Sequence, residues 1–307
     1  MTRSWLTPLV IAFWCVANGW LMVDKILPAF LSRPPSGSSA QPGDDGRFVP
    51  VAWSVVWDER PVGTAVSQST PLPDGGLSID SLLDLRRLPL DELIPPWLKL
   101  LVRQTMPTGL QVSLAATGRV AIDADGRLES FHSIVRLPET GETIFVHGTV
   151  TGDNVEVAIR AGDLRYETSR PLGKAALVTD ELSPQAMLPG LTVGQRWTAP
   201  VFSPLRTGQS SIELLHAHVE RETMTFDEDR PVTTRLVTYR SSPAPDAQPR
   251  LRMWVTREGR VIRQEALVGA SRIMFLRRSD AEAADLAAAL DPETAETAPA
   301  PSPTDAP

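Results

Sequence analysis

The stretch 51-VAWSVVWD-58 decides the fold class of this chain. Its largest apolar side chains, Val51, Trp53, Val55 and Trp57, stand at every second position. In an extended chain such residues point to one face, and this period of two is typical of a half-buried β-strand. The stretch therefore predicts a strand with an apolar face that the rest of the protein must cover.

Runs of the same kind recur along the chain, many of them in pairs that a short turn separates. Asp125-Gly126 divides residues 120–137 into two such runs, and Gly152-Asp153-Asn154 divides residues 143–160. Two extended runs around a Gly-containing turn are typical of a β-hairpin. Further runs, with turns at 229–231 and 258–259, occupy residues 196–202, 211–226, 231–240, 251–268 and 271–278. About ten strands in successive hairpins predict a mainly β fold with an antiparallel sheet.

The N-terminus carries a long apolar segment. Residues 4–23 are 20 uncharged residues, which as a helix span roughly 30 Å, the thickness of a bilayer core. Trp5 and Trp20 stand near its two ends, where indole rings favour the headgroup region. We expect residues 1–31 to be a transmembrane anchor of one helix that binds the protein to the lipid bilayer. The short N-terminal stub favours a cytoplasmic N-terminus, with the rest of the chain on the periplasmic side of the inner membrane.

A cleaved signal peptide and a lipoprotein signal are the alternatives to an anchor. The small residues ending at Ala17 resemble a cleavage site, but apolar residues continue to Val23, which favours an uncleaved anchor. A lipoprotein signal places a small residue before its cysteine, whereas Trp14 precedes Cys15. Because Cys15 is the only cysteine, the sequence excludes an intrachain disulfide and a thiolate metal cluster.

Composition divides the rest of the chain into three parts. Residues 32–47 are rich in Pro, Ser and Gly, which is typical of a flexible tether. Residues 48–278 are expected to form the folded β domain. Residues 279–307 hold seven acidic residues and no Lys or Arg, so we expect an acidic, largely disordered tail that is partly helical in its Ala-rich start. This tail accounts for the net charge of −7, and the neutral remainder gives nucleic-acid binding little electrostatic support.

One segment of the β domain departs from the period of two. Residues 79–106 are rich in Leu at spacings nearer three or four, and Asp91 stands where it would cap a helix. We therefore expect a helical insertion at 79–106. It either covers one face of the sheet or fills the inside of a curved sheet.

Motifs for catalysis or cofactor binding are absent from the sequence. It contains no Gly-x-Ser-x-Gly elbow, phosphate-binding loop or dinucleotide fingerprint. His216, His218 and Glu220 alternate along one expected strand, but the outer two lie about 13 Å apart, too far to hold one ion together. We expect these three side chains to form a solvated face, and we expect no metal, no cofactor and no enzymatic activity.

Four arginines surround one expected hairpin. Arg252, Arg257, Arg260 and Arg263 either meet an anionic headgroup or form a solvated strand surface that resists aggregation. The second interpretation is favoured, because charged side chains commonly protect strands in this way.

Two motifs carry a resemblance to a known architecture. They are LPGLTVGQRW at 188–197 and the pattern W-V-x-x-x-G-x-V at 254–261. Together with the anchor and the tether they resemble bacterial membrane-anchored envelope proteins with a LolA-like half-barrel, the fold of lipoprotein carriers. The resemblance covers about residues 50–278 and implies a curved antiparallel sheet that wraps helices and shelters acyl chains. No ligand residue of the carriers transfers to a position of this chain.

Two hypotheses for function follow. In the first, the β domain binds a lipid or another apolar ligand, as a carrier or sensor, in a groove lined by Trp53, Trp57, Leu93, Trp97, Leu98, Leu101, Trp197 and Trp254. In the second, the domain is a non-catalytic structural or assembly module that recruits a protein partner in the cell envelope, and the same residues simply fill the core. A carrier needs an apolar cavity large enough for its ligand, whereas an assembly module does not.

Overall fold

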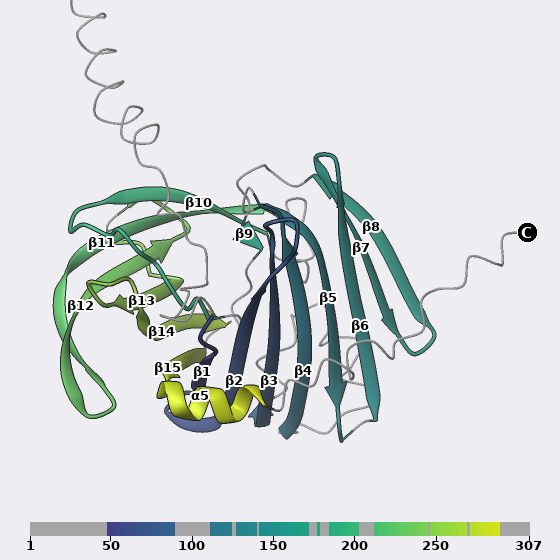
Figure 1. Ribbon diagram of the computed structural model, residues 1–307, viewed down its shortest axis with the longest axis horizontal. Coiled ribbons are helices and arrows are strands. Elements are labelled where there is room, and N and C mark those ends of the chain that lie inside the picture. The colour runs from purple at the N-terminus through teal and green to yellow at the C-terminus, as the bar shows by residue number, and fades with distance from the viewer. Residues whose placement is uncertain are drawn as a thin grey trace, which may run out of the picture.

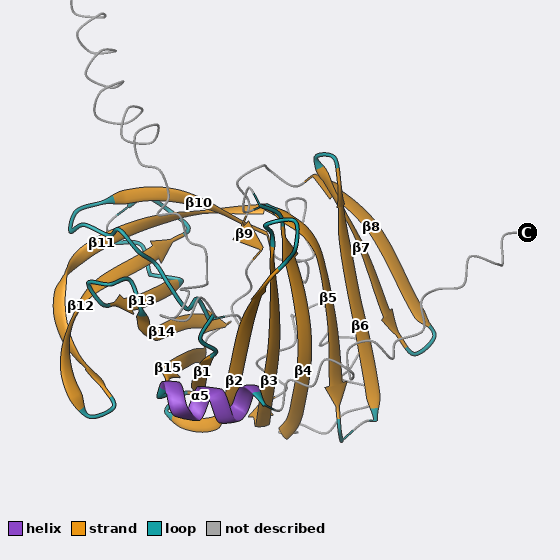
Figure 2. Cartoon of the chain, in the orientation of Figure 1, coloured by secondary structure: helices purple, strands orange, loops and turns teal. Residues whose placement is uncertain are grey.

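The computed structural model describes residues 48–89, 111–124, 127–139, 141–171, 177–178, 184–202, 212–244, 246–268 and 271–288. Within these ranges the chain forms fifteen β-strands and one helix, and strands dominate the cartoon in Figure 2. The mainly β class predicted from the sequence is confirmed. Strands are more numerous than predicted because polar segments such as 164–171 also form them.

All fifteen strands belong to one sheet. Its first part comprises β1 Val51–Trp57, β2 Arg60–Pro71, β3 Leu77–Pro89, β4 Gln111–Ile122, β5 Leu128–Leu137, β6 Glu142–Thr151, β7 Asn154–Ala161 and β8 Leu164–Pro171. Its second part comprises β9 Leu177–Val178, β10 Arg196–Phe202, β11 Ile212–Asp227, β12 Arg230–Arg240, β13 Leu251–Val255, β14 Val261–Val268 and β15 Ser271–Arg277.

The spatial order of the strands places the first and last ones side by side. The order is β8-β7-β6-β5-β4-β3-β2-β1-β15-β14-β13-β12-β11-β10-β9. Every neighbouring pair is antiparallel except β9 and β10. At the centre, Trp53 of β1 lies opposite Arg277 of β15, and Arg278 donates a hydrogen bond to the Ser54 hydroxyl across 224 residues of sequence.

The sheet has two regions of different shape. We call β1–β3 with β10–β15 the curled region, and β5–β8 the wing; β4 joins them. Figure 1 shows the strands of the curled region bending around an interior, whereas the wing strands run side by side away from it. The main hydrophobic core fills the interior of the curled region, and a smaller cluster lies on the wing.

Strand β1 supplies the centre of the main core. Val51, Trp53, Val55 and Trp57 are all buried and belong to this cluster. Trp53 and Val55 have no exposed surface. The apolar face that the period of two predicts is therefore the inner face of the sheet.

The helix lies on the opposite, outer face of the sheet. Helix α5, Asp280–Ala287, begins with a capping box in which Ser279 and Glu282 satisfy each other's backbone N–H groups. Its Ala283 and Ala287 pack against Ala52 of β1 and Val66 of β2. Figures 1 and 2 show it lying across these strands. The folded domain therefore extends beyond residue 278, and the helical start expected for the tail is part of it.

The prediction of a helix from residue 79 is wrong for residues 79–89, which form all but the first two residues of β3. A β-bulge explains the misleading spacing. Leu85 lies opposite Leu114 and Leu88 opposite Val112, so three steps on β3 match two on β4. The bulge contains Arg87, which has a left-handed conformation with φ of 59°. The bulge keeps Leu85 and Leu88 on the inner face at a spacing of three, which imitates a helical period.

Three further predictions fall on other parts of the chain. Residues 90–106 of the expected helical insertion lie outside the described residues, and so do the anchor at 1–31 and the tether at 32–47. Within the residues that the structure describes, no helix has the length and apolar character needed to cross a bilayer.

Candidate functional site: the inner face of the sheet

One row of directly opposite residues crosses the inner face from the centre of the sheet to its edge. The pairings run, strand by strand from β1 to β8, through Trp53, Ala65, Leu83, Ala116, Val135, Ile144, Ala161 and Leu164. All eight residues are apolar. We call this set the apolar row.

Burial decreases along the apolar row. Trp53 is 0% exposed and Ala65 is 6% exposed, whereas Leu164 at the far end is 64% exposed. The residues between them, including Val135 and Ile144 on the wing, are half-buried. The inner face is therefore a filled core at one end and an open apolar surface at the other.

Close packing accounts for the filled end. Trp53, Trp57 and Trp197 are 0%, 3% and 5% exposed, and all three belong to the main core. The ring of Trp197 meets that of Tyr239 edge to face, with centroids 5.8 Å apart. Burial raises the pKa of Tyr239 well above its usual range. These three predicted groove residues lie together, as core side chains.

The segment 184–191 closes the interior of the curled region. Its Ala186, Met187, Leu188 and Leu191 are buried in the main core. The backbone N–H of Leu188 donates to the carbonyl oxygen of Gly259 at 2.7 Å. The segment therefore belongs to the folded core, although it forms no strand.

The two sequence motifs that carried the family resemblance meet at this point. Gly259 has φ of 93°, and a Cβ atom there would lie 2.6 Å from the Cα of Pro189. Only glycine allows both this conformation and this approach. Pro189 of the first motif thus packs directly on Gly259 of the second.

A cation lies at the buried end of the apolar row. Arg277, opposite Trp53, donates hydrogen bonds to the carbonyl oxygens of Ala186 at 3.1 Å and Val261 at 3.4 Å. Burial, with a contribution from Arg260, lowers the pKa of Arg277 to about 10. Carbonyl groups hold this guanidinium, which remains charged at neutral pH.

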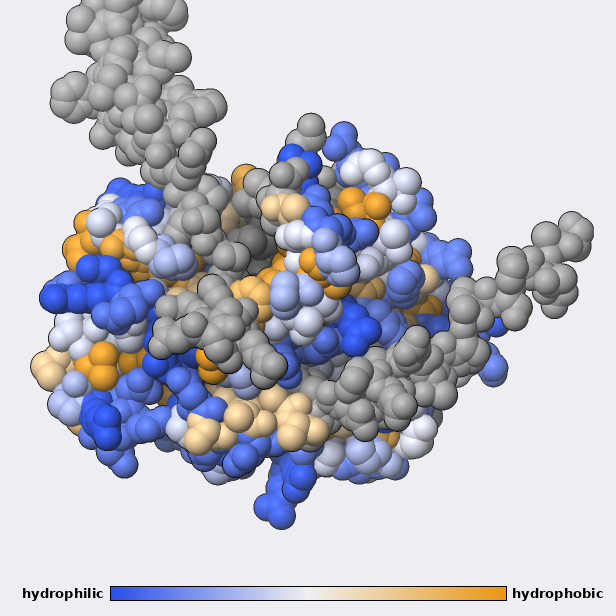
Figure 3. All heavy atoms as spheres, viewed as in Figure 1, coloured by the Kyte–Doolittle hydropathy of each residue, from blue (hydrophilic) through white to orange (hydrophobic). Residues whose placement is uncertain are grey.

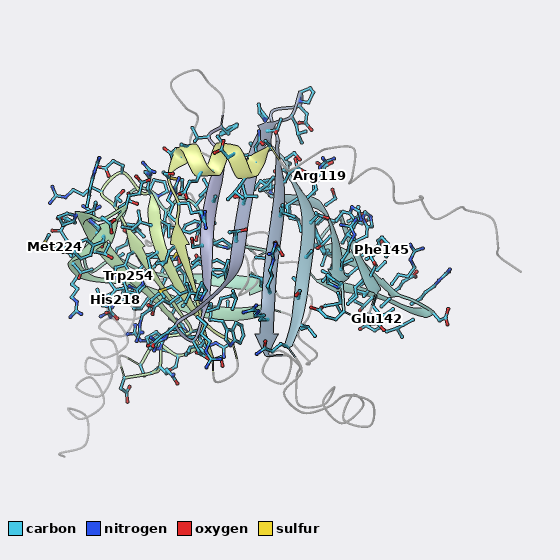
Figure 4. The ribbon with its side chains drawn as sticks, turned by 90° about the horizontal axis from the view of Figure 1, so that it is seen from below. Arg119, Glu142, Phe145, His218, Met224 and Trp254 are labelled. Carbon is cyan, nitrogen blue, oxygen red and sulfur yellow. The ribbon has the colours of Figure 1, made fainter. Side chains whose placement is uncertain are left out.

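Trp254 does not share the inner face with the other tryptophans. Its neighbours Met253 and Val255 are buried in the core, while Trp254 is only half-buried. The Arg263 guanidinium lies over its ring, 4.6 Å from the centroid. Figure 4 labels Trp254 on the curled region. The prediction that Trp254 lines a common groove is therefore wrong, because strand alternation turns it to the outer face. The other predicted groove residues, Leu93, Trp97, Leu98 and Leu101, lie outside the described residues.

The wing carries its own apolar cluster on the inner face. Phe131, Val146, Val155 and Val157 are buried there. Partly buried residues pack against them: Val120, Leu128, Ile144, Val150 and Ile159. The wing face is thus apolar beyond the single row, and much of it remains half-exposed.

Polar side chains predominate on the outer face of β3 to β6, where Ile134 is the buried apolar exception. Arg119 of β4 forms an ion pair with Asp80 of β3 at 2.6 Å and lies opposite His132 of β5, which in turn lies opposite His147 of β6. The two imidazole rings are 6.3 Å apart. Burial lowers the pKa of His132, and His147 and Arg119 lower it further. Figure 4 labels Arg119 and Phe145 of this face.

Ion pairs involve all four arginines of the expected hairpin. Arg252 and Arg263 both contact Glu265, Arg257 contacts Glu222 and Arg260 contacts Asp280. Each of the four arginines of the expected hairpin therefore has a carboxylate partner, and Glu265, the partner shared by Arg252 and Arg263, is buried. Figure 3 shows hydrophilic side chains distributed widely over the visible face.

One of the alternating polar residues of β11, Glu220, is also held by hydrogen bonds to neighbouring side chains. Glu220 accepts hydrogen bonds from Arg240 at 2.6 Å and Thr238 at 2.9 Å. Burial alone would raise the pKa of Glu220, but these hydrogen bonds outweigh it and the pKa is lowered. Leu215, Ala217 and Val219 are buried on the opposite face, as the sequence predicts. Among the described residues, no group of three or more His, Cys, Asp or Glu side chains is arranged to hold a metal.

A small pocket lies on the surface of the curled region. It has a volume of about 70 Å³, and Arg250, Arg252, Glu265 and Arg272 are among its lining residues. This pocket is polar and too small for an acyl chain. It does not provide the apolar cavity that a carrier needs.

Comparisons with known proteins add little to this geometry. The sequence matches no protein-family model and no curated protein. Two solved structures are similar in part. One is a β-barrel-like protein of the domain of unknown function DUF1849 from Brucella abortus, with 11% identity and a TM-score of 0.43 over 76% of this chain and 97% of that one. The other is a DUF1089 family protein from Pseudomonas aeruginosa, with 16% identity and a TM-score of 0.30 over 64% of this chain and 87% of that one.

Sequence reasoning missed the wing as part of the inner face. The alternation in residues 143–150 and the two-residue turns at 152–153 and 162–163 set the register of β6, β7 and β8. Following that register from Ile144 to Leu164 would have found the open end of the apolar row. The large tryptophans drew attention to the filled end instead.

Proposed function

We propose that the protein binds a lipid or another apolar ligand on the inner face of the wing. The apolar row carries this proposal, because its exposure rises from 0% at Trp53 to 64% at Leu164. Fully burying a large apolar side chain is worth roughly 1.5–3 kcal/mol. An apolar ligand lying along Val135, Ile144 and Leu164 would gain from covering several such side chains at once.

The interior of the curled region is filled, so the wing is the part of the inner face that a ligand can reach. This interior is occupied by Trp53, Trp197 and the segment 184–191. A ligand that entered there would have to displace packed core residues. The shared inner face lets a ligand on the wing continue the hydrophobic core, and the LolA-type carriers that the sequence resembles also shelter acyl chains with a curved sheet.

The proposal includes attachment to a membrane. Residues 4–23 form the uncharged stretch that would span the inner membrane, and the β domain would then lie on the periplasmic side, where it meets lipids. Protease added to intact spheroplasts should remove the domain. Full protection of the domain would refute this location.

We also propose that binding is the whole of the activity, without catalysis, metal or cofactor. This rests on the absence of nucleophile, phosphate-binding and dinucleotide motifs from the sequence. Loss of a bound lipid's ester bond during incubation with the purified protein would contradict it.

Native mass spectrometry of the full chain purified from cells tests ligand binding. Ile144→Ser places a hydroxyl on the inner face of β6 and should reduce co-purified lipid several-fold. Phe145→Ser is the matched control, because Phe145 is also half-buried on β6 but faces outward, beneath the Arg160 guanidinium at 4.7 Å. Equal lipid content in both variants, or a wild-type protein that carries no lipid and takes up no fluorescent fatty acid, would refute the carrier function.

An assembly module is the second candidate, and one observation favours it. Met224 and Phe226 are 69% and 73% exposed and point to the same face of the β11–β12 hairpin. Figure 4 shows Met224 at the periphery of the curled region. A photo-crosslinking residue at position 226 should then capture one protein partner in cells, and the same residue at Thr225, which faces the other way, should not.

A further inference from the structure

The sheet has two edges of very different length. One is β9, which is two residues long, and the other is β8, which is eight residues long. Within the described residues, β8 pairs only with β7. Leu164, Arg165, Tyr166 and Glu167 are all exposed. A long exposed edge strand presents unpaired backbone groups that another strand can pair with.

The hairpin geometry determines which backbone groups face the open edge. Gly162 and Asp163 form a two-residue turn that joins Ala161 to Leu164. In such a turn the flanking residues form a hydrogen-bonded pair, and the pairing then alternates along the strands. Leu164, Tyr166 and Thr168 therefore direct their backbone groups toward β7, and Arg165, Glu167 and Ser169 direct theirs outward.

We infer that β8 is a dimerisation edge that pairs antiparallel with β8 of a second copy of this chain, around a two-fold axis at Tyr166. In this register Arg165 lies opposite Glu167 of the second copy, and Glu167 opposite Arg165. Both residues have outward backbone groups, so each such pair also exchanges backbone hydrogen bonds. The two side chains of each pair carry opposite charges and share the outer face of the sheet.

The inner face fits the same register. Tyr166 lies opposite Tyr166 of the second copy in a non-hydrogen-bonded pair, where side chains come closest. Leu164 lies opposite Thr168 on either side of this aromatic pair. Aromatic and opposite-charge pairs stabilise antiparallel strands. Every side chain from Leu164 to Thr168 therefore meets a compatible partner.

The neighbouring registers bring like charges directly opposite each other. An axis at Arg165 places two guanidinium groups directly opposite each other, and an axis at Glu167 does the same with two carboxylates. Like charges directly opposite destabilise a strand pair. The order Arg-Tyr-Glu is therefore self-complementary in one register and repulsive in the registers two residues to either side.

This interface lies beyond the proposed ligand site and does not depend on it. Pairing through β8 would join the two sheets into one and make the inner faces of the two wings continuous at Tyr166. An eight-residue edge buries a small area, so we expect a weak, concentration-dependent dimer rather than a permanent one.

Charge exchange tests the inference on the full chain in detergent, by sedimentation at increasing protein concentration. Arg165→Glu and Glu167→Arg should each weaken dimerisation about tenfold or more, because each replaces two attractive pairs by two repulsive ones. The double variant with both changes should dimerise like the wild type. An equimolar mixture of the two single variants should also dimerise, since opposite charges then meet across the interface.

Cysteine cross-linking tests the register directly, in a Cys15→Ser background. Tyr166→Cys should give a disulfide-linked dimer, because residues directly opposite on neighbouring antiparallel strands lie within the Cα range that a disulfide requires. Leu164→Cys alone should not, although its mixture with Thr168→Cys should. A wild-type protein that is monomeric at all concentrations, insensitivity to the charge variants, or equal cross-linking by Leu164→Cys and Tyr166→Cys would overturn the inference.

Discussion

The curled region and the wing are parts of one sheet with the same strand alternation, yet they bury their inner faces to different degrees. Trp53 in the curled region has no exposed surface, while Leu164 in the same row on the wing is 64% exposed. The difference shows that the main core forms where the sheet bends back over itself, whereas the wing buries only a small cluster of four residues.

The β-bulges help to explain where the sheet bends. Register shifts interrupt the β1–β2, β11–β12 and β13–β14 pairs of the curled region, and the β3–β4 and β4–β5 pairs on the two sides of β4. The β5–β6, β6–β7 and β7–β8 pairs of the wing have regular registers throughout. Because a bulge bends its strand and increases the local twist, these bulges contribute to the bending of the sheet, whereas the pairs within the wing lack this cause of bending.

The largest expected effect compares a truncation at each end of the apolar row. Trp53→Ala should lower the free energy of unfolding by about 3–5 kcal/mol, as is usual when a fully buried aromatic side chain is removed. Ile144→Ala on the wing should cost about 1 kcal/mol, because its side chain is already partly exposed. Urea denaturation of both variants measures this difference. Similar losses would contradict the contrast between a filled and an open end.

A smaller difference in stability is expected between Ala substitutions at two glycines with positive φ. Gly259→Ala forces a Cβ against the backbone of Pro189, whereas Gly152→Ala in the wing hairpin meets no atom within 4 Å. Both variants suffer backbone strain, since φ is 93° at Gly259 and 64° at Gly152, and the clash should make Gly259→Ala less stable by a further 1–3 kcal/mol, roughly the cost of overpacking. Thermal or chemical unfolding of the pair measures this term. Equal stabilities would mean that the segment 184–191 moves aside easily.

The smallest expected effect is the pH dependence of the wing. The pKa of His132 is lowered from 6.5 in the folded protein, so below about pH 6.5 the unfolded chain binds more protons than the folded one. Above that pH His132 is neutral in both states and does not reduce the free energy of unfolding. As the pH falls, protonation favours the unfolded chain, so the folded protein loses stability. His132→Gln should therefore flatten the stability profile between pH 7 and pH 5. His216→Gln on β11 is the control, and an equal change in both variants would exclude a specific role of His132.

The sequence predicted the mainly β class well and the bulged strand poorly. The alternation of Val51, Trp53, Val55 and Trp57 identified β1 and its buried face. This was possible because the pattern of a regular strand is contained in the strand's own sequence. The bulge at Arg87 is not visible in one strand, because it exists only relative to β4. Its spacing of three between Leu85 and Leu88 therefore looked helical.

The candidate site was predicted only in part for a similar reason. Large apolar residues such as Trp197 were predicted either to line a groove or to fill the core, because residue size does not reveal whether an inner face is covered. Trp254 lies one strand position away from that face, beneath Arg263. Exposure of Ile144 and Leu164 depends on the bending of distant strands, which no local pattern encodes.

The pairing of β1 with β15 determines the order in which the protein can be completed during synthesis. The wing hairpins join residues close in sequence and can form as the chain leaves the ribosome. Strand β1, in contrast, keeps one edge open until the last strand emerges, because Ser54 and Arg278 are 224 residues apart. Contacts of such long sequence separation form slowly. The middle of the sheet, although it is the best-buried part of the finished molecule, is therefore its last part to close and the part most exposed to mispairing in the nascent chain.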